Sequence, residues 1–165
     1  DEWKNRSLQE PGAVMEYNDV RVNVLAYSLT HLWREPLPAV LKRKVMDPIG
    51  ASSTWRWFGY DHAWTVIDGY RMQSVTGGGH SGGGIFISAE DMARFGLLFL
   101  NEGSWNGTQL LSEEWIREAT SPSKPNPNYG YMWWLNAAGE TAPAAPRSCW
   151  PSLSRRSPSP SWARR

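Results

Sequence analysis

Two short motifs in this sequence carry residue types that act as nucleophiles in hydrolases. Gly79-His80-Ser81-Gly82-Gly83 fits the G-x-S-x-G pattern of a nucleophile elbow, and Ser121-Pro122-Ser123-Lys124 fits S-x-x-K. An elbow needs a strand before the serine and a helix directly after it, whereas glycines and the strand-like run Ile85-Phe86-Ile87 follow Ser81. In the second motif Pro125 disfavours helical backbone at Lys124. We therefore expect residues 121–124 to form a Pro-rich loop. The G-x-S-x-G match makes an α/β-hydrolase a weaker alternative.

The sequence contains no motif that is typical of a metal site or a phosphate-binding loop. The histidines His31, His62 and His80 are scattered, and the single Cys149 excludes both an intramolecular disulfide and a cysteine metal cluster. The glycines of residues 77–84 are not followed by the Lys-Ser/Thr pair of a phosphate-binding loop. We expect no metal site and no cofactor.

Charge divides the chain into two parts. Residues 1–136 carry 12 basic and 15 acidic side chains, a net charge of −3, whereas residues 137–165 carry five arginines and one glutamate. The acidic body argues against a nucleic-acid partner, and the lack of an 18-residue apolar run argues against an integral membrane segment. We expect one folded domain over residues 1–136. Residues 137–165, rich in Ala, Pro, Ser and Arg, predict a disordered tail or an out-of-frame ending.

The element that must position His80 is the segment of residues 77–100. Two glycine triplets flank His80 and Ser81, then comes a short apolar strand, and then a helix that Ser88 can cap, with Asp91 reaching back in a capping box. Gly103 supplies the stop. The helical spacing predicts one inward face, formed by Met92, Phe95, Leu98 and Phe99. The glycines fit either a tight bend that packs a strand on a helix or the wall of a pocket around His80.

Upstream, the sequence predicts two helices and a hairpin. After a turn at Pro11-Gly12, Asp19 can cap a helix to about Leu32. Its expected inward face is formed by Val20, Val24, Leu25, Ser28 and Leu29. A second helix beginning near Pro38 has an apolar stripe of Val40, Leu41 and Val45. Strands are expected at residues 55–57 and 65–67, the second pairing with residues 69–72.

Downstream, the expected order is turn, helix, loop and strand. Residues 104–107 form a turn, Ser112 caps a helix over residues 113–120, and residues 121–128 form a loop. Residues 129–135, YGYMWWL, have the aromatic composition typical of a strand.

Several segments, taken in order, resemble the class C β-lactamase family, which includes penicillin-binding proteins and related serine esterases. The segment from Pro11 to Leu29 resembles the family's Pro-Gly followed by Tyr-x-Asn at a helix start, with Tyr17 matching the tyrosine. DPIGASSTW, from Asp47, resembles Pro-Leu-Gly-Met-x-x-Thr, with Thr54 at the threonine. GGGIFISAEDMARF, LLSEEWIREATSP and NYGYMWWLN follow in the family's order, so the resemblance spans residues 11–136.

The resemblance implies an α+β fold of the β-lactamase or transpeptidase type. It would be incomplete here, with a helical region and part of an antiparallel sheet flanked by helices. The nucleophilic Ser-x-x-Lys would precede Asp1 and the third motif would follow Trp134. We therefore expect the central-to-late part of a larger serine hydrolase, inactive by itself. Relatives act mostly outside the cytoplasm, which makes a periplasmic or extracellular location the expectation from resemblance.

The resemblance also implies roles for particular residues. Tyr17 would be the general base and acid that moves the serine proton, and Asp19 occupies the position of the family's Asn. An ionised carboxylate there cannot donate a hydrogen bond, which weakens the case for a β-lactam over an ester or amide. His80, Gly82 and Gly83 would line the substrate site. Because a free phenol has a pKa of about 10, deprotonation at pH 7 costs about 4 kcal/mol without nearby lysines.

Two other functions fit the composition. Eleven tryptophans are unusual, and a carbohydrate- or ligand-binding module could use an aromatic platform built from Trp55, Trp57, Trp64, Trp133 and Trp134. A non-catalytic relative could also keep the fold as a scaffold.

Overall fold

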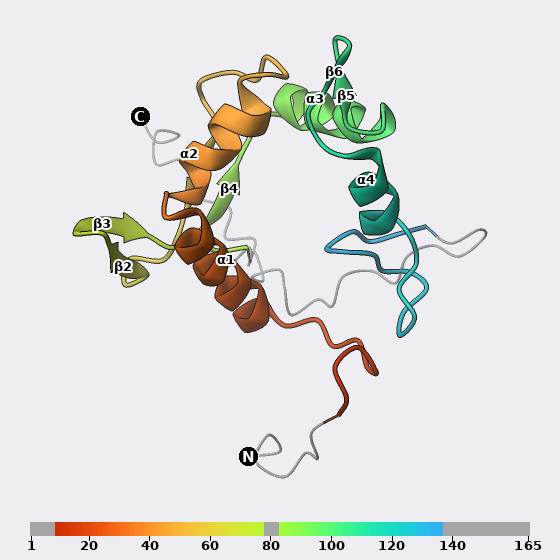
Figure 1. The fold of residues 1–165 in the computed structure, drawn as a ribbon, viewed down its shortest axis with the longest axis horizontal. Coiled ribbons are helices and arrows are strands. Elements are labelled where there is room, and N and C mark those ends of the chain that lie inside the picture. The colour runs from red at the N-terminus through yellow and green to blue at the C-terminus, as the bar shows by residue number, and fades with distance from the viewer. Residues whose placement is uncertain (1–8, 78–82, 137–165) are drawn as a thin grey trace, which may run out of the picture.

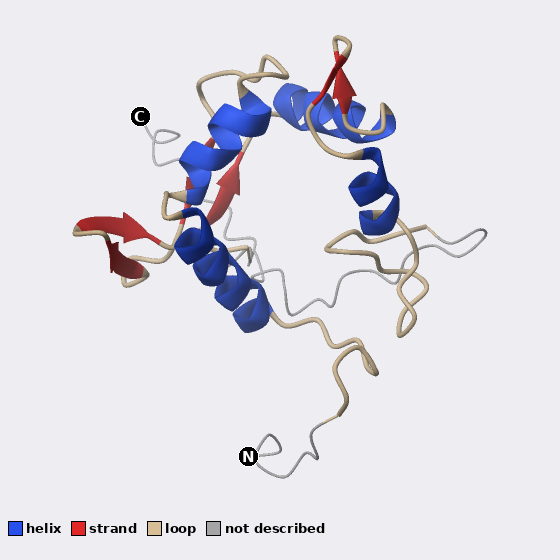
Figure 2. Ribbon diagram, in the orientation of Figure 1, coloured by secondary structure: helices blue, strands red, loops and turns tan. Residues whose placement is uncertain are grey.

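The computed structural model describes residues 9–77 and 83–136 of the chain. Four α-helices lie within these ranges: α1 (Asp19–Trp33), α2 (Leu37–Leu41), α3 (Ala89–Leu100) and α4 (Glu113–Ala119). A π-helical turn, η2 (Lys42–Met46), continues α2. Six short strands form three two-stranded antiparallel sheets. The described chain is therefore a mixed α+β structure, as the sequence predicts (Figure 2).

The cap of helix α1 lies one residue earlier than predicted. The side chain of Asn18, not Asp19, accepts hydrogen bonds from the backbone N–H groups of Val20 (2.9 Å) and Arg21 (3.3 Å), and Asp19 is the first helical residue. The predicted inward face is confirmed only for Leu29, which packs against the core, whereas Val20, Val24 and Leu25 are exposed. The buried positions are Ala26 and Thr30, since α1 packs against α2 and Val75 along that side.

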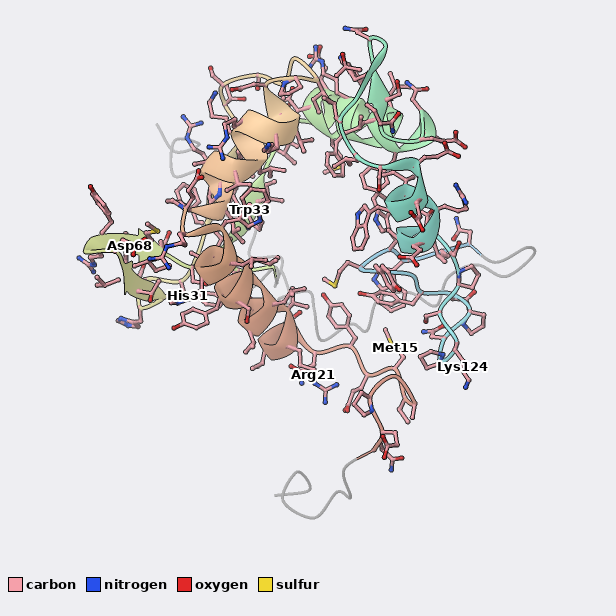
Figure 3. All side chains as sticks on the ribbon, in the orientation of Figure 1. Met15, Arg21, His31, Trp33, Asp68 and Lys124 are labelled. Atoms are coloured by element: carbon pink, nitrogen blue, oxygen red, sulfur yellow. The ribbon has the colours of Figure 1, made fainter. Side chains whose placement is uncertain are left out.

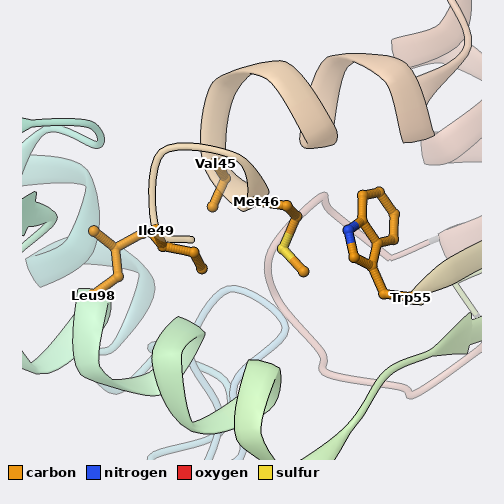
Figure 4. Close-up of a cluster of buried hydrophobic side chains, with 5 residues drawn as sticks. All are labelled: Val45, Met46, Ile49, Trp55 and Leu98. Carbon is orange, nitrogen blue, oxygen red and sulfur yellow. The ribbon is translucent and has the colours of Figure 1, made fainter. Parts of the chain in front are cut away.

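The main core lies between α2–η2 and α3. Val45, Met46 and Ile49 pack with Trp55 and with Leu98, which is fully buried (Figure 4). The predicted stripe of the second helix is confirmed, because Val40 and Val45 are buried and Leu41 is half-buried against this cluster.

The strands form three separate ribbons. β2 (Trp64–Ile67) pairs with β3 (Tyr70–Gln73) in the predicted hairpin, whose turn residues Asp68 and Gly69 both have positive φ, as a type I′ turn requires. β1 (Arg56–Phe58) pairs with β4 (Gly84–Phe86), so Trp57 lies opposite Ile85. β5 (Ser104–Trp105) and β6 (Thr108–Gln109) form a small hairpin at the predicted turn.

The β2–β3 hairpin lies beside the C-terminal end of α1. Arg34, the cap residue of α1, forms an ion pair with Asp68 in the hairpin turn. The hydroxyl of Thr65 lies 3.4 Å from Nε2 of His31. Figure 3 shows His31 and Asp68 on facing sides of this junction.

The caps of the two later helices are confirmed. Ser88 Oγ accepts from the N–H of Asp91 at 3.1 Å, and Ser112 Oγ accepts from that of Trp115 at 3.1 Å. Gly103, with φ of +82°, ends the α3 segment by donating to the carbonyl of Leu98. On α3 the predicted face holds for Leu98, whereas Met92 is 58% exposed.

The predicted strand over residues 129–135 is wrong. The segment folds back on itself: Tyr129 and Trp134 form an isolated bridge, Gly130 N–H donates to the carbonyl of Trp133, and Met132 has a φ of +66°. Within the described residues no strand pairs with this segment. Its backbone groups therefore form hydrogen bonds within the segment, because backbone donors and acceptors need partners.

The elements follow one another around an open arc (Figure 1). Helix α1 and the segment 129–135, far apart in sequence, approach each other where Tyr17 meets Trp134. None of the helices in residues 9–77 and 83–136 has the length and apolar content needed to cross a membrane.

Candidate functional site

Tyr17 lies directly before the cap of α1 and is 37% exposed. Its ring centroid is 6.0 Å from that of Trp134, which in turn stacks edge-on against Tyr129 at 4.9 Å. The phenol is therefore at the surface of the described fold, on an aromatic group contributed by the other end of the sequence. This position is compatible with a group that transfers a proton to a bound molecule.

The segment carrying Trp134 is held by both later helices. Trp133 packs on Phe99 of α3 (centroids 4.5 Å apart), and Tyr131 packs on Trp115 of α4 (5.6 Å). The N–H of Tyr131 donates to the carbonyl of Ala119 at 2.9 Å. The aromatic partner of Tyr17 is thus anchored on two helices.

Tyr129, next to Trp134, differs from Tyr17 in its surroundings. Burial raises the pKa of the Tyr129 phenol above its ordinary value, because the charged form loses solvation. Its hydroxyl donates to the sulfur of Met132 at 3.5 Å. Tyr129 therefore stays protonated at neutral pH and packs as a neutral ring.

The residues of the expected Tyr-x-Asn motif have distinct structural positions. Asn18 uses its side-chain oxygen to cap α1, so this oxygen is occupied by backbone. Asp19 lies in the first turn of α1, where the helix dipole favours a carboxylate. The position that the resemblance assigns to an asparagine therefore carries a negative charge at a helix N-terminus.

One turn further along α1, Asn23 binds the segment that leads into the glycines. Its Oδ1 accepts from the hydroxyl of Thr76 at 2.6 Å and from the N–H of Gly77 at 3.2 Å. The carbonyl of the same Thr76 accepts from Nε1 of Trp57 at 2.8 Å. Helix α1 and strand β1 thereby fix the backbone immediately before residue 78.

The two described ends of the glycine segment lie at close approaches. A Cβ on Gly77 would overlap Cγ1 of Val22 in α1, and a Cβ on Gly83 would overlap Cγ2 of Thr76 and lie 3.3 Å from the ring of Tyr60. Glycine is needed at both positions because a neighbour occupies the side-chain space. His80 and Gly82, like Ser81, lie outside the described residues, whereas Gly83 is at this boundary.

The remaining motifs occupy loops and strands. Strand β4, not a helix, follows the G-x-S-x-G pattern, which is not the arrangement of a nucleophile elbow. Residues 121–124 form the predicted loop, in which Ser123 Oγ donates to the carbonyl of Asn126 at 2.9 Å. Neither segment supplies a serine one helical turn from a lysine.

The tryptophans of the expected platform are dispersed among the elements. Trp55 is buried in the core, and Trp57 is half-buried, with its indole N–H bound. Trp64, on the β2–β3 hairpin, lies under the guanidinium of Arg71 at 4.4 Å. Trp133 and Trp134 belong to the separate segment near Tyr17. In the part of the chain that the structure describes, no three His, Cys, Asp or Glu side chains gather as metal ligands would.

Sequence patterns missed Asn23 and Thr76, and they misassigned the role of Asp91. Asparagine is a poor residue for a helix interior, so Asn23 in the middle of α1 was the available signal for a structural contact. Asp91 is fully buried, and its carboxylate accepts from the N–H (2.9 Å) and hydroxyl (2.6 Å) of Ser52 and from Arg94 (2.9 Å). It therefore ties the loop after η2 to α3 instead of completing the capping box predicted with Ser88.

Comparison with known proteins gives distant relatives. No family model matches the chain. It is similar to two proteins of Mycobacterium tuberculosis, "Uncharacterized protein MT1414" of strain CDC 1551 / Oshkosh and "Protein Rv1367c" of strain H37Rv. Each is 25% identical over 166 residues, which cover 85% of this chain and 41% of the relative. The chain thus spans less than half the length of these relatives, and neither name states an activity.

Proposed function

We propose that this chain is the central-to-late part of a β-lactamase-like serine hydrolase with a transpeptidase-like fold. The enzyme would transfer an acyl group from an ester, amide or β-lactam to a serine that lies outside this chain. The observation that carries the proposal is the position of Tyr17: an accessible phenol at the start of α1, the helix whose Asn23 holds the entry to the glycine segment.

The proposed chemistry uses Tyr17 as the proton carrier. As the serine oxygen bonds to the substrate carbonyl carbon, its proton passes to the Tyr17 phenolate, and the same proton then goes to the leaving group as the old bond breaks. Water subsequently hydrolyses the acyl-serine with the same groups. Backbone N–H donors would stabilise the oxyanion, and the segment around His80, Gly82 and Gly83 is the proposed place for substrate contacts.

Asp19 favours esters over β-lactams within this proposal. A neutral asparagine amide can donate a hydrogen bond to a substrate carbonyl, whereas an ionised carboxylate can only accept. The proposed substrate class is therefore a neutral ester or amide that does not need a donor at this position.

Covalent labelling of the full-length protein tests the proposal. A fluorophosphonate probe should label one serine within a Ser-x-x-Lys sequence upstream of residue 1, and nitrophenyl acetate should be hydrolysed with a burst of nitrophenol. Absence of both labelling and turnover, in a folded protein, would refute the hydrolase assignment. Hydrolysis that survives replacement of the upstream serine by alanine would refute the acyl-serine mechanism.

Non-catalytic functions are the alternative, and one observation favours them. Tyr17, Trp134 and Tyr129 form a contiguous aromatic group with two partly exposed rings, a composition that suits sugars or flat apolar ligands. A binding module would bind soluble glycans with a change in tryptophan fluorescence and would show no turnover. A scaffold would show neither.

A further inference from the structure

A cavity lies between the second helix and the first strand, in a region that the proposed hydrolase chemistry does not use. Its volume is about 330 Å³, at the lower end of the range for small-molecule sites. One wall comes from α2 and η2, and the other comes from β1 and the preceding loop. It is lined by Pro38, Ala39, Lys42, Asp47, Ala51, Ser52, Ser53, Trp55, Arg56, Trp57 and Phe58.

The floor of this cavity is apolar and fixed in place. Trp55 belongs to the main core, and Trp57 is held through its indole N–H on Thr76. The loop on the same side is tied to α3, because Ser52 donates twice to the buried Asp91. Rigid aromatic walls bind a flat apolar ligand without a large ordering cost.

Two cationic side chains line the cavity, and among the described residues only one of them is paired with a carboxylate. Lys42 is paired with Asp47, whose two carboxylate oxygens lie 2.7 and 2.6 Å from Nζ. Arg56 donates only through Nη1, to the carbonyls of Ser53 (2.6 Å) and Trp55 (2.7 Å). Among the described residues neither Nε nor Nη2 of Arg56 has a hydrogen-bond partner, and no carboxylate pairs with it.

This arrangement matches an anchored receptor for a carboxylate. The two carbonyls hold the guanidinium at Nη1, and Nε and Nη2 together form the side-on fork that binds both oxygens of one planar carboxylate. A single fork beside an aromatic wall fits one monoanionic, planar group more closely than a compact polyanion such as phosphate.

We propose that this cavity binds a small aromatic carboxylic acid, with the ring against Trp55, Trp57 and Phe58 and the carboxylate on Arg56. The site is independent of the proposed hydrolase activity, since none of its residues belongs to the Tyr17 region. Its failure and the failure of the hydrolase assignment are therefore separately observable.

Calorimetric titration of the full-length protein tests the site with two matched probes. 2-Naphthoate should bind at least tenfold more tightly than 2-naphthalenemethanol, which has the same ring system and no charge. Arg56→Gln should remove this difference, while Arg56→Lys, which keeps a charge but not the fork, should retain part of it. Arg21→Gln, an exposed arginine on α1 outside the cavity, is the matched control and should leave both affinities unchanged.

A blocking variant separates the cavity from nonspecific adsorption. Ala39 is exposed on α2 and lines the cavity, so Ala39→Trp should fill it and abolish binding of both probes without unfolding the helix. Equal affinity for the two probes, or naphthoate binding that survives Arg56→Gln or Ala39→Trp, would overturn the proposal. So would the absence of binding at millimolar naphthoate.

Discussion

Asn23 Oδ1 lies 2.6 Å from the hydroxyl of Thr76, and this contact joins the middle of α1 to the residue just before the glycine segment. The same oxygen accepts from the N–H of Gly77. Thr76 is 2% exposed and Asn23 is half-buried, so water can only partly replace the hydrogen bond between them. The contact links α1 to β1 through Thr76, whose N–H donates to the carbonyl of Phe58 at 3.3 Å.

Replacing Asn23 by leucine should therefore destabilise the fold. The change removes the acceptor of the buried Thr76 hydroxyl and of the exposed Gly77 N–H, and we expect a loss of about 1–3 kcal/mol in the free energy of unfolding. Urea unfolding followed by circular dichroism measures this loss. In the double variant Asn23→Leu, Thr76→Val, the total loss should be smaller than the sum of the two single losses. Additive losses would show that the two side chains are not coupled.

Two glycines offer a matched test of the close approaches. Gly83→Ala would push a Cβ against Thr76 and the ring of Tyr60, and such overpacking costs about 1–3 kcal/mol. Gly96→Ala, inside α3, meets no atom within 4 Å and should stabilise the protein by about 0.5–1 kcal/mol, because glycine weakens a helix. Thermal unfolding should shift in opposite directions. A neutral Gly83→Ala would mean that Thr76 is free to move.

Features set by neighbouring residues were predictable from the sequence. Ser88 and Ser112 cap their helices because a hydroxyl reaches an N–H three residues ahead whatever the rest of the chain does. The hairpin turn at Asp68 and Gly69 follows from their tolerance of positive φ. The chemistry that decides these features is complete within a few residues.

Features set by distant residues were not predictable in the same way. The inward face of α1 depends on α2 and Val75, which pack on Ala26 and leave Val24 in solvent. Asp91 binds Ser52, far away in sequence, in preference to the capping box. In the candidate site, Tyr17 at a helix start was predictable from the pattern, but its contact with Trp134 was not. No local rule specifies which of two apolar faces, or which of two donors, a folded chain will choose.

The Asp91–Ser52 contact should make stability sensitive to acid. The hydroxyl and then the N–H of Ser52, with smaller contributions from Ser88 and Arg94, lower the pKa of Asp91 below its ordinary value despite burial. A depressed carboxyl pKa stabilises the fold fully above the unfolded value of about 3.9, and the contribution is lost as the pH falls through the folded value. The urea midpoint of the wild type should therefore drop steeply below about pH 4.

The variant Asp91→Asn should have a lower urea midpoint than the wild type at pH 7, and its urea midpoint should fall less steeply as the pH is lowered. Glu90→Gln is the control: Glu90 is largely exposed and also pairs with Arg94, so its loss should leave the acid limb unchanged. If the wild type and Asp91→Asn show the same pH profile, Asp91 does not carry the acid sensitivity.

Exposed apolar side chains predict that the 165-residue chain will self-associate when it is expressed alone. Leu32 and Leu100 are 76% and 82% exposed, and the pair β1–β4 has free strand edges within the described residues, which favours aggregation. We expect binding of anilinonaphthalene sulfonate and broad elution in size-exclusion chromatography. Leu32→Lys with Leu100→Lys should reduce both. A monodisperse chain with a sharp two-state calorimetric transition would contradict this prediction.

Tyr17→Phe in the full-length protein is the most direct test of the proposed catalysis. The change deletes one oxygen and keeps the ring that contacts Trp134, so the melting temperature should stay close to that of the wild type. Loss of a general base should lower kcat for nitrophenyl acetate by about 10²–10⁴-fold, with a smaller change in KM. Tyr129→Phe is the matched control, because Tyr129 packs on the same tryptophan with its hydroxyl directed to Met132, and it should retain wild-type turnover. Equal activity of the wild type and Tyr17→Phe would remove the phenol from the mechanism, whereas equal losses in the two variants would mean that the aromatic group only supports the fold.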